Sequence, residues 1–531
     1  MINQRSSLSW ALPYGSQRSP IFAKNIVSTS QPLAAQAGVR ILQAGGNAVD
    51  AAIATAITLT VVEPTSNGIG SDAFAIIYDG EKLIGLNASG RSPIDWSIDR
   101  LKQHHATMPE LGWDSVTTPG AVSAWKALSD RFGKLPFAKL FESAIDYANN
   151  GFLVSPYIAS KWQASKSRFQ DFKHFNDTFF ALDDIKPGVL IKLKDHGKTL
   201  DQIAKTAGES FYRGELADKI EQQAIKEGGD LRAKDLDQHQ PLWVETISQS
   251  FEHYQLHELP PNGQGLATLI ALGILRHRDI KRLPLMSVES LHLQLEAMKL
   301  AFKAVHQYVG DPDINEDWQF LLTDEILASL AESISMDQAQ TPELIVKPNS
   351  GTVYLSTADQ SGMMVSYIQS NYLGFGSGIV IEGTGISLQN RGAGFVFDLG
   401  HINEAAASKR PFHTIIPGFL MSGQTPVMSF GVMGGHMQPQ GHLQVLLNTL
   451  IGNMNPQSAL DAPRWHVHED FSISLEPGFG ATMLNALADK GHQIAINSDD
   501  ALYGAGQIIY RLADGYCAGS EPRVDGCALG F

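Results

Sequence analysis

The sequence has almost no cysteine, with Cys517 and Cys527 as the two cysteines in 531 residues. Two cysteines are too few for a disulfide framework or for a zinc site built on four cysteine ligands. This scarcity is typical of proteins from a reducing compartment. Because residues 1–25 also contain no apolar signal segment, we expect a cytoplasmic protein.

The sequence also lacks a long hydrophobic run and an excess of basic charge. The longest apolar stretch, Ala51 to Val62, contains threonines and is shorter than the roughly 20 residues that cross a bilayer. Lys and Arg number 40 against 55 Asp and Glu, which gives a formal net charge of −15. Nucleic acids and anionic membranes attract basic surfaces. We therefore expect neither as a partner and favour a small-molecule ligand.

The composition is that of an ordinary globular protein, with 43% hydrophobic and 18% charged residues,. Its length allows about three domains or one large unit of helices and sheets. Apolar residues recur at helical spacing from Pro32 to Val62, and Gly45-Gly46 divides this stretch into two helices,. The second helix is apolar on most sides, which predicts an inner helix packed against a sheet.

A β-hairpin is predicted where the last third of the chain begins. It joins Val353–Ala358 to Met363–Gln369 through a four-residue loop,. In a pairing centred on residue 361, Thr352 lies opposite Ser370. Residues 338–350, just before this hairpin, are polar with two prolines and indicate an exposed linker,.

A second hairpin is predicted from Thr414–Leu420 and Val427–Met433,. It ends in Gly434-Gly435, and a helix is expected to begin near Pro439,. The backbone N–H groups of the two glycines would then lie between a strand and a helix N-terminus, where they could bind an oxyanion.

The histidines do not form a metal-binding pattern. The three closest sets are His104-His105, His436 with His442, and His466 with His468, and none has the H-x-x-x-H or H-E-x-x-H spacing,. We therefore expect no metal and no other cofactor. The chain also lacks the G-x-S-x-G motif of common serine hydrolases,.

Thr352, which follows Gly351 at the junction of the linker and the first hairpin, is the main candidate for a catalytic residue. In isolation such a threonine is ordinarily a strand cap. If the Gly351–Thr352 bond is cut, however, Thr352 gains an α-amine that can act as the base for its own hydroxyl. Ser370, across the hairpin, is placed to orient that hydroxyl.

Ordered blocks over nearly the whole chain resemble those of the gamma-glutamyltranspeptidase family of N-terminal-nucleophile hydrolases. These blocks are Ala44–Ala52, Val62–Pro64, Thr118–Gly120, Phe211–Gly214, Pro260-Pro261, Gly351-Thr352, Phe375–Gly378, Gly383–Ile386, Met433–Gly435, Asp461–Arg464 and Asp525-Gly526. The resemblance implies an α+β fold, a four-layer αββα sandwich. It also implies self-cleavage into a large subunit, 1–351, and a small catalytic subunit, 352–531.

By the same resemblance, Thr352 is the nucleophile, Ser370 assists it, and Gly434 and Gly435 form the oxyanion hole. The implied partners are a small-molecule amide substrate and the two subunits of one precursor, and the resemblance allows a homodimer of such heterodimers. Three sets of residues depart from the pattern that binds a γ-glutamyl group. Ser89 replaces the usual arginine and leaves Arg91 two positions later, Gly394 replaces an acid while Arg391 precedes it, and His413 and Thr414 replace paired serines.

These departures predict a pocket with Arg91, Arg391, His413 and Thr414 and with no acid for a substrate ammonium. Such a pocket suits an anionic amide without an amino group. The segment Asn87–Arg91 resembles the branch with oxamate amidohydrolases and cephalosporin-acylase-like proteins, which points to an oxamate-like substrate. Three alternatives remain open: a glutathione-using transferase, a scaffold without turnover, and structural ion pairs for the two arginines.

Overall fold

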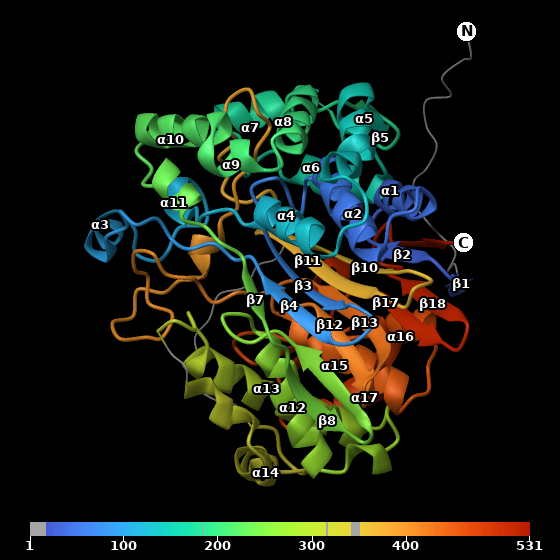
Figure 1. Ribbon diagram of the computed structural model, residues 1–531. Helices are drawn as coiled ribbons and strands as arrows, with labels where there is room; N and C mark the ends of the chain where they lie inside the picture. Colours follow the sequence, from blue (N-terminus) through green and yellow to red (C-terminus); the bar gives the residue numbers. More distant parts are fainter. Residues whose placement is uncertain (1–16, 183, 315–316, 341–350) are drawn as a thin grey trace.

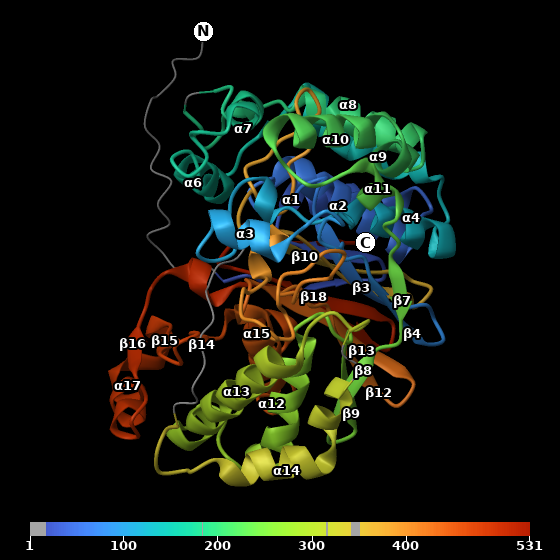
Figure 2. The same ribbon diagram turned by 90° about the vertical axis from the view of Figure 1, so that its left-hand side faces the viewer.

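The computed structural model describes residues 17–182, 184–314, 317–340 and 351–531. Two seven-stranded sheets lie between two layers of helices (Figures 1 and 2). The upper sheet in Figure 1 has the order β19 (Cys527–Gly530), β2 (Ile26–Thr29), β10 (Gly351–Ala358), β11 (Met364–Tyr372), β3 (Asp72–Tyr78), β4 (Leu83–Asn87) and β7 (Leu242–Val244). The lower sheet has the order β1 (Ile21–Ala23), β18 (Gly515–Ser520), β17 (Ala505–Leu512), β13 (Thr425–Met433), β12 (Gly418–Ser422), β9 (Tyr254–Glu258) and β8 (Ile247–Phe251).

Helices cover the outer face of each sheet. The layer at the top of Figure 1 contains α1 (Pro32–Gln43), α2 (Ala48–Val62), α4 (Ala121–Phe132), α5 (Glu142–Asn150), α6 (Pro156–Ala164), α7 (Lys173–Phe179), α8 (Lys194–Lys205), α9 (Glu209–Arg213) and α10 (Glu215–Glu227). The layer at the bottom contains α12 (Gly265–His277), α13 (Val288–Tyr308), α14 (Asp324–Ser333) and α15 (Met437–Leu450). The predicted α+β class and four-layer αββα sandwich are confirmed.

The remaining α-helices and strands are mostly short. They are α3 (Ile98–His104), α11 (Ala233–Asp237), α16 (Pro456–Asp461), α17 (Gly480–Asp489), the paired strands β5 (Phe152–Leu153) and β6 (Leu190–Ile191), and a small sheet of β14 (Trp465–Val467), β15 (Ile473–Leu475) and β16 (Ile494–Ile496). Figure 2 shows α17 and β14 to β16 at one side of the molecule. No described helix is both long and apolar enough to cross a bilayer.

The predicted inner helix is α2, whose fifteen residues are all buried. It begins with a reciprocal cap in which the Asp50 N–H donates to Asn47 Oδ1 (2.9 Å) and the Asn47 N–H donates to Asp50 Oδ2 (3.1 Å),. The helix packs in the apolar core between the first helical layer and the upper sheet. A second core lies between the two sheets and a third between the lower sheet and its helices.

The register predicted for the first hairpin is confirmed. β10 and β11 pair antiparallel with Val353 opposite Gln369 and Ala358 opposite Met364, so paired residue numbers sum to 722. The pairing shifts by one residue between Gly351 and Val353. This irregularity lies at Thr352 and separates its backbone from the regular ladder.

The second hairpin is shorter at its start than predicted, because β12 begins at Gly418 and not at Thr414. The Thr414 side chain binds a buried arginine instead, and His413 forms a single bridge with Gly263. The following helix, α15, begins at Met437, two residues before the expected Pro439. Pro439 fits in the first turn, where a backbone N–H has no helical partner to lose.

The predicted linker 338–350 lies outside the described residues from 341 onward. Its first residues are bound to α13 and to the end of α17. The Ala339 N–H donates to Lys490 O (2.7 Å), and the Gln340 N–H donates to Glu296 Oε2 (3.0 Å).

Candidate active site

Thr352 and Ser370 meet at the irregular end of the first hairpin, as the register predicts. Thr352 Oγ1 lies 3.1 Å from Ser370 Oγ. Both residues are buried, Thr352 at 1% and Ser370 at 0% exposure. A hydroxyl pair enclosed in this way is held in one geometry and is shielded from bulk water.

Ser370 is also bound to the peptide group before Thr352. Its hydroxyl donates to the carbonyl oxygen of Gly351 (2.6 Å) and accepts from the Tyr372 N–H (2.8 Å) and from Arg391 Nη2 (3.2 Å). A hydroxyl has one proton and two lone pairs. These three bonds use the proton and both lone pairs, so the Thr352 hydroxyl competes with Arg391 for the same lone pair of Ser370 Oγ.

Arg391 is the buried cation of the site, with 0% exposure. Its Nη1 donates to Thr414 Oγ1 (2.8 Å), and its guanidinium carbon lies 4.2 Å from the centre of the Tyr372 ring. Burial lowers its pKa to about 10, which leaves it protonated at neutral pH. Its buried Nε has no hydrogen-bond partner, so one N–H donor remains available near Ser370.

His413 faces Asp72, which the sequence analysis did not identify. His413 Nε2 lies 3.1 Å from Asp72 Oδ2, and both side chains are fully buried. The Ile415 N–H points at His413 Nδ1 (3.4 Å), so Nδ1 accepts and Nε2 carries the proton,. Burial, with Arg391 nearby, lowers the pKa of His413 well below its usual value, and the ring is therefore neutral.

Asp72 lies directly opposite Ser370 in the pairing of β3 with β11. Its Oδ1 accepts from the N–H groups of Gly90 (3.2 Å) and Gly120 (3.1 Å). Burial raises its pKa to about 7, although Arg391 and these N–H groups oppose the rise. Its signal in the sequence is a single carboxylate between a glycine-rich turn and the apolar run Ala73–Tyr78.

Arg91 is not part of this network. Its guanidinium forms ion pairs with Asp311 (2.7 Å) and with Asp313, and it donates to Ser408 O (2.7 Å). Among the bonds of the described residues, none joins Arg91 to Thr352 or Arg391. The structure therefore contains the structural ion pairs that were one of the two alternatives for this arginine. A substrate-binding role for Arg91 stays a prediction.

Gly434 and Gly435 connect to the same network through Gln264. Both glycines have positive φ, 137° and 59°, which places them in conformations that L side chains rarely adopt. Gln264 Nε2 donates to Gly435 O (2.8 Å) and to Thr414 O (2.6 Å). Neither glycine N–H donates to another residue that the structure describes, and the oxyanion role of these groups stays a prediction.

A cavity of about 810 Å³ borders this site. Its wall includes Tyr372, which contacts both Ser370 and Arg391, and His436, which follows Gly435. Gly394, the position where the sequence lacks an acid, also lines it. Thr352 itself does not line the cavity, and Tyr372 is the residue that joins the cavity wall to Ser370 and Arg391.

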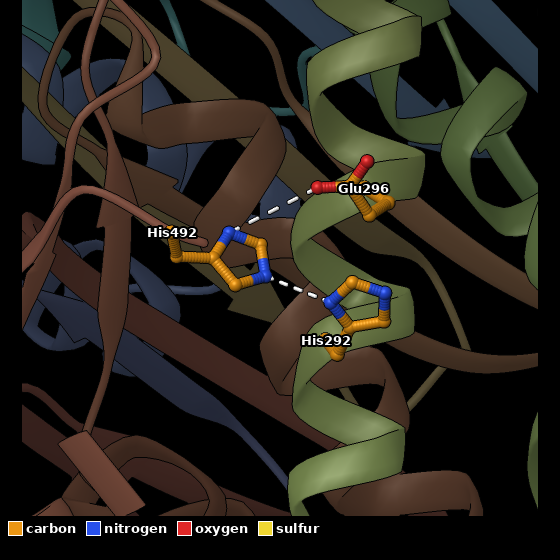
Figure 3. A group of neighbouring side chains, drawn as sticks. All are labelled: His292, Glu296 and His492. Atoms are coloured by element: carbon orange, nitrogen blue, oxygen red, sulfur yellow. Dashed lines mark hydrogen bonds and ion pairs between the residues drawn. The ribbon is translucent and has the colours of Figure 1, made fainter. Parts of the chain in front are cut away.

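Among the described residues, one group of side chains lies close enough together to hold a metal ion, and it contains none of the histidines considered in the sequence analysis. That group is His292, Glu296 and His492 (Figure 3). Lys299 Nζ donates to Glu296 Oε1 (2.9 Å) and lies 3.2 Å from His492 Nδ1. His492 Nε2 is 2.8 Å from His292 Nδ1, and His292 Nε2 is 2.7 Å from Ser335 O.

These distances define one consistent arrangement of protons. Lys299 donates to His492, His492 donates to His292, and His292 donates to the Ser335 carbonyl. Burial lowers the pKa of both histidines, which keeps them neutral. No ring nitrogen has a free lone pair, and an ammonium lies beside the carboxylate, so the group does not fit a metal ion.

Comparison with known proteins gives three consistent results. A model of the gamma-glutamyltranspeptidase family matches residues 34–531. The "Glutathione hydrolase-like YwrD proenzyme" of Bacillus subtilis is 33% identical over 526 residues, which cover 97% of this chain and 100% of that protein. The "Oxamate amidohydrolase proenzyme" of Klebsiella pneumoniae is 33% identical over 520 residues, which cover 94% of this chain and 97% of that protein.

The fold agrees with that of a solved cephalosporin acylase from Bacillus halodurans. The two structures superpose with a TM-score of 0.93 and 46% sequence identity. The match covers 98% of this chain and 99% of the other.

Proposed function

Because the chain belongs to the gamma-glutamyltranspeptidase family, which consists of hydrolases and transferases with an N-terminal nucleophile, we propose that it cleaves itself before Thr352 and then hydrolyses a small amide. The observation that carries the proposal is the double contact of Ser370. One hydroxyl binds both the Thr352 hydroxyl and the carbonyl oxygen of Gly351.

Self-cleavage follows from that contact. Thr352 Oγ attacks the Gly351 carbonyl carbon, and the Ser370 O–H stabilises the oxyanion that forms on the carbonyl oxygen. The C–N bond then breaks, the Thr352 nitrogen takes the hydroxyl proton, and Gly351 is left as an ester on Thr352. Water hydrolyses the ester and releases a large subunit, 1–351, and a small subunit, 352–531.

Hydrolysis of a substrate repeats this chemistry with a new base. The freed α-amine of Thr352 takes the hydroxyl proton while Oγ attacks the substrate carbonyl. The Gly434 and Gly435 N–H groups hold the oxyanion, the α-ammonium returns the proton to the leaving amine, and an acyl ester remains on Thr352. Water attacks the ester, and the acid leaves.

The substrate proposed is an amide with a carboxylate and no ammonium on its acyl half. Arg391 supports this because it is a buried cation whose Nε–H is unpaired, while Nη2 of the same guanidinium donates to Ser370. A buried guanidinium that still has one unbonded N–H donor favours an anionic ligand,. Gly394 offers no carboxylate to an ammonium, and one relative is named an oxamate amidohydrolase.

The test measures hydrolysis of oxamate, glutathione and a γ-glutamyl anilide by the purified chain, with a denaturing gel beside each assay. We expect two fragments that end and begin at Gly351 and Thr352, and faster release of the acid from oxamate than from glutathione. Rapid transfer from the anilide to an amino acid would contradict this substrate and favour a transferase. A stable uncut chain without turnover would favour a scaffold.

A further inference from the structure

We propose that the cavity of about 810 Å³ beside Tyr372 binds a flat aromatic group on the amine half of the substrate. This inference rests on the proposed function, because it assigns a second half to the amide that Thr352 attacks. It also changes the expected substrate from a small oxamate-like amide to a larger one.

The size of the cavity is the first argument. A volume of about 810 Å³ lies in the range of pockets that enclose drug-sized ligands, roughly 300–1,000 Å³. The leaving group of oxamate is ammonia, which would occupy a small fraction of this space. A substrate that filled the cavity and excluded water from its wall would need a much larger amine half.

The chemistry of the wall is the second argument. The wall contains Met108, Phe395, Phe397 and Phe412 together with the rings of His306 and His436. The His306 and Phe412 rings are stacked, with centres 5.2 Å apart and planes 29° from parallel, and Phe412 lies 24° from the plane of His436 at 6.3 Å. Burial lowers the pKa of His306 to about 3 and of His436 to about 4, so both rings are neutral. Flat, uncharged rings of this kind stack with an aromatic ligand.

The position of Arg391 decides which half of the amide enters. Arg391 is fully buried and does not line the cavity. Its guanidinium lies on the Tyr372 ring, with Tyr372 itself in the cavity wall. A carboxylate on the acyl half therefore ends at Arg391, and the cavity is left for the amine half.

Oxamate and oxanilate, its N-phenyl derivative, test the inference. They share the same carboxylate and acyl group and differ only in the phenyl ring on nitrogen. We expect kcat/KM for oxanilate to exceed that for oxamate by on the order of 100-fold, because the ring leaves water and stacks in the cavity. Equal values, or a preference for oxamate, would overturn the inference.

Two variants locate the effect. Phe412→Leu keeps an apolar side chain but removes the flat ring, and His306→Leu replaces the other ring of the stacked pair with an apolar side chain that is not flat. Each is expected to reduce the oxanilate preference about tenfold, and unchanged melting temperatures would show that both fold. Phe320→Ala is the control, because this half-exposed phenylalanine lies outside the cavity lining. A preference that survives both Leu variants would place the ring elsewhere.

Failure of the proposed function is distinguishable from failure of this inference. If neither compound is hydrolysed, the proposed function fails, and calorimetric titration of both into the purified chain still tests the cavity. Oxanilate that binds at least tenfold more tightly than oxamate, and that loses this advantage in Phe412→Leu, would support the cavity. Equal binding of the two would reject it.

Discussion

The hydroxyl of Ser370 donates a hydrogen bond of 2.6 Å to the carbonyl oxygen of Gly351. This bond polarises the carbonyl that self-cleavage would attack, and it holds that carbonyl beside the hydroxyl of the next residue. Once Gly351 leaves, the Ser370 proton is free to be donated elsewhere, and Thr352 Oγ1 at 3.1 Å is its nearest hydroxyl. The proton of this one side chain would therefore have one acceptor before the cut and another after it.

Thr352→Ala is expected to give one uncut chain with no amidase activity, since the proposed mechanism uses a single hydroxyl as the nucleophile in both reactions. A denaturing gel and an amide hydrolysis assay measure the two losses. Val353→Ala, one position further along β10, is the matched control and should cleave. An active Thr352→Ala protein would refute the mechanism.

Ser370→Ala is expected to slow self-cleavage by on the order of 10²- to 10³-fold, the usual cost of one lost oxyanion donor. Ser370→Thr keeps the hydroxyl and should cleave much faster than the alanine variant. The readout is the time course of fragment formation after synthesis. Alanine and threonine variants that cleave equally would show that the hydroxyl has no role.

Arg391→Gln is expected to raise KM for a carboxylate substrate by on the order of 10- to 150-fold, which corresponds to about 1.5–3 kcal/mol for a charged hydrogen bond. A neutral amide of the same size should show no comparable change. Arg91→Ala separates the alternatives for the other arginine. Its ion pairs with Asp311 and Asp313 lead us to expect less than about a threefold change in KM, and a larger rise would assign Arg91 to the pocket.

Stability is expected to be greatest near pH 6.5. Burial raises the pKa of Glu63 and Asp72 to about 7 and that of Glu469 to about 8. The unfolded chain has released these protons by pH 6.5, whereas the folded chain releases them only as pH passes 7 to 8, so the free energy of unfolding falls over this range,.

Below pH 6.5 the histidines act in the opposite direction. Seven of them have a pKa lowered by burial to about 3 or 4, namely His196, His239, His257, His306, His436, His466 and His492. The unfolded chain binds more protons here, so stability rises with pH from about 4 to 6.5. Melting temperatures from pH 4 to 9 test both limbs, and Glu469→Gln should flatten the decline between pH 7 and 8. A stability that keeps rising to pH 8 would contradict this account.

Zinc ions and chelators are expected to leave the melting temperature of the protein unchanged, because Lys299 is bonded to both Glu296 and His492. Lys299→Ala removes the ammonium and should destabilise the chain by about 3–5 kcal/mol, the usual cost of breaking a buried ion pair. Zinc should then restore part of the lost stability. A chelator that lowers the melting temperature of the unaltered protein would reverse this interpretation.

The sequence predicts the Thr352–Ser370 contact because both residues belong to one hairpin, whose loop sets the register locally. It also identifies Arg391 and Thr414 through the family pattern, although not that they bind each other. Asp72 could not be found in this way. Its pairing with His413 depends on two segments 341 residues apart, and an isolated carboxylate before a strand is usually exposed.

The cavity depends on long-range packing to a greater extent. His306 comes from α13, Phe412 from the segment before β12, and His436 from the turn before α15. No periodicity in the sequence relates these three segments. The direction in which Arg91 points was equally undetermined, since its partners Asp311 and Asp313 are more than 200 positions away.

The order of strands in the upper sheet has a consequence for how the protein is made. β2 precedes the Gly351–Thr352 bond in the chain yet lies between β19, which follows the bond, and β10, which begins with it; β11 in turn pairs with β3. Neither part of the polypeptide could complete this sheet alone, so the proposed cleavage would have to come after folding. Two subunits synthesised from separate messenger RNAs would have to fold together. A cleaved protein unfolded by denaturant would refold less readily than the intact precursor.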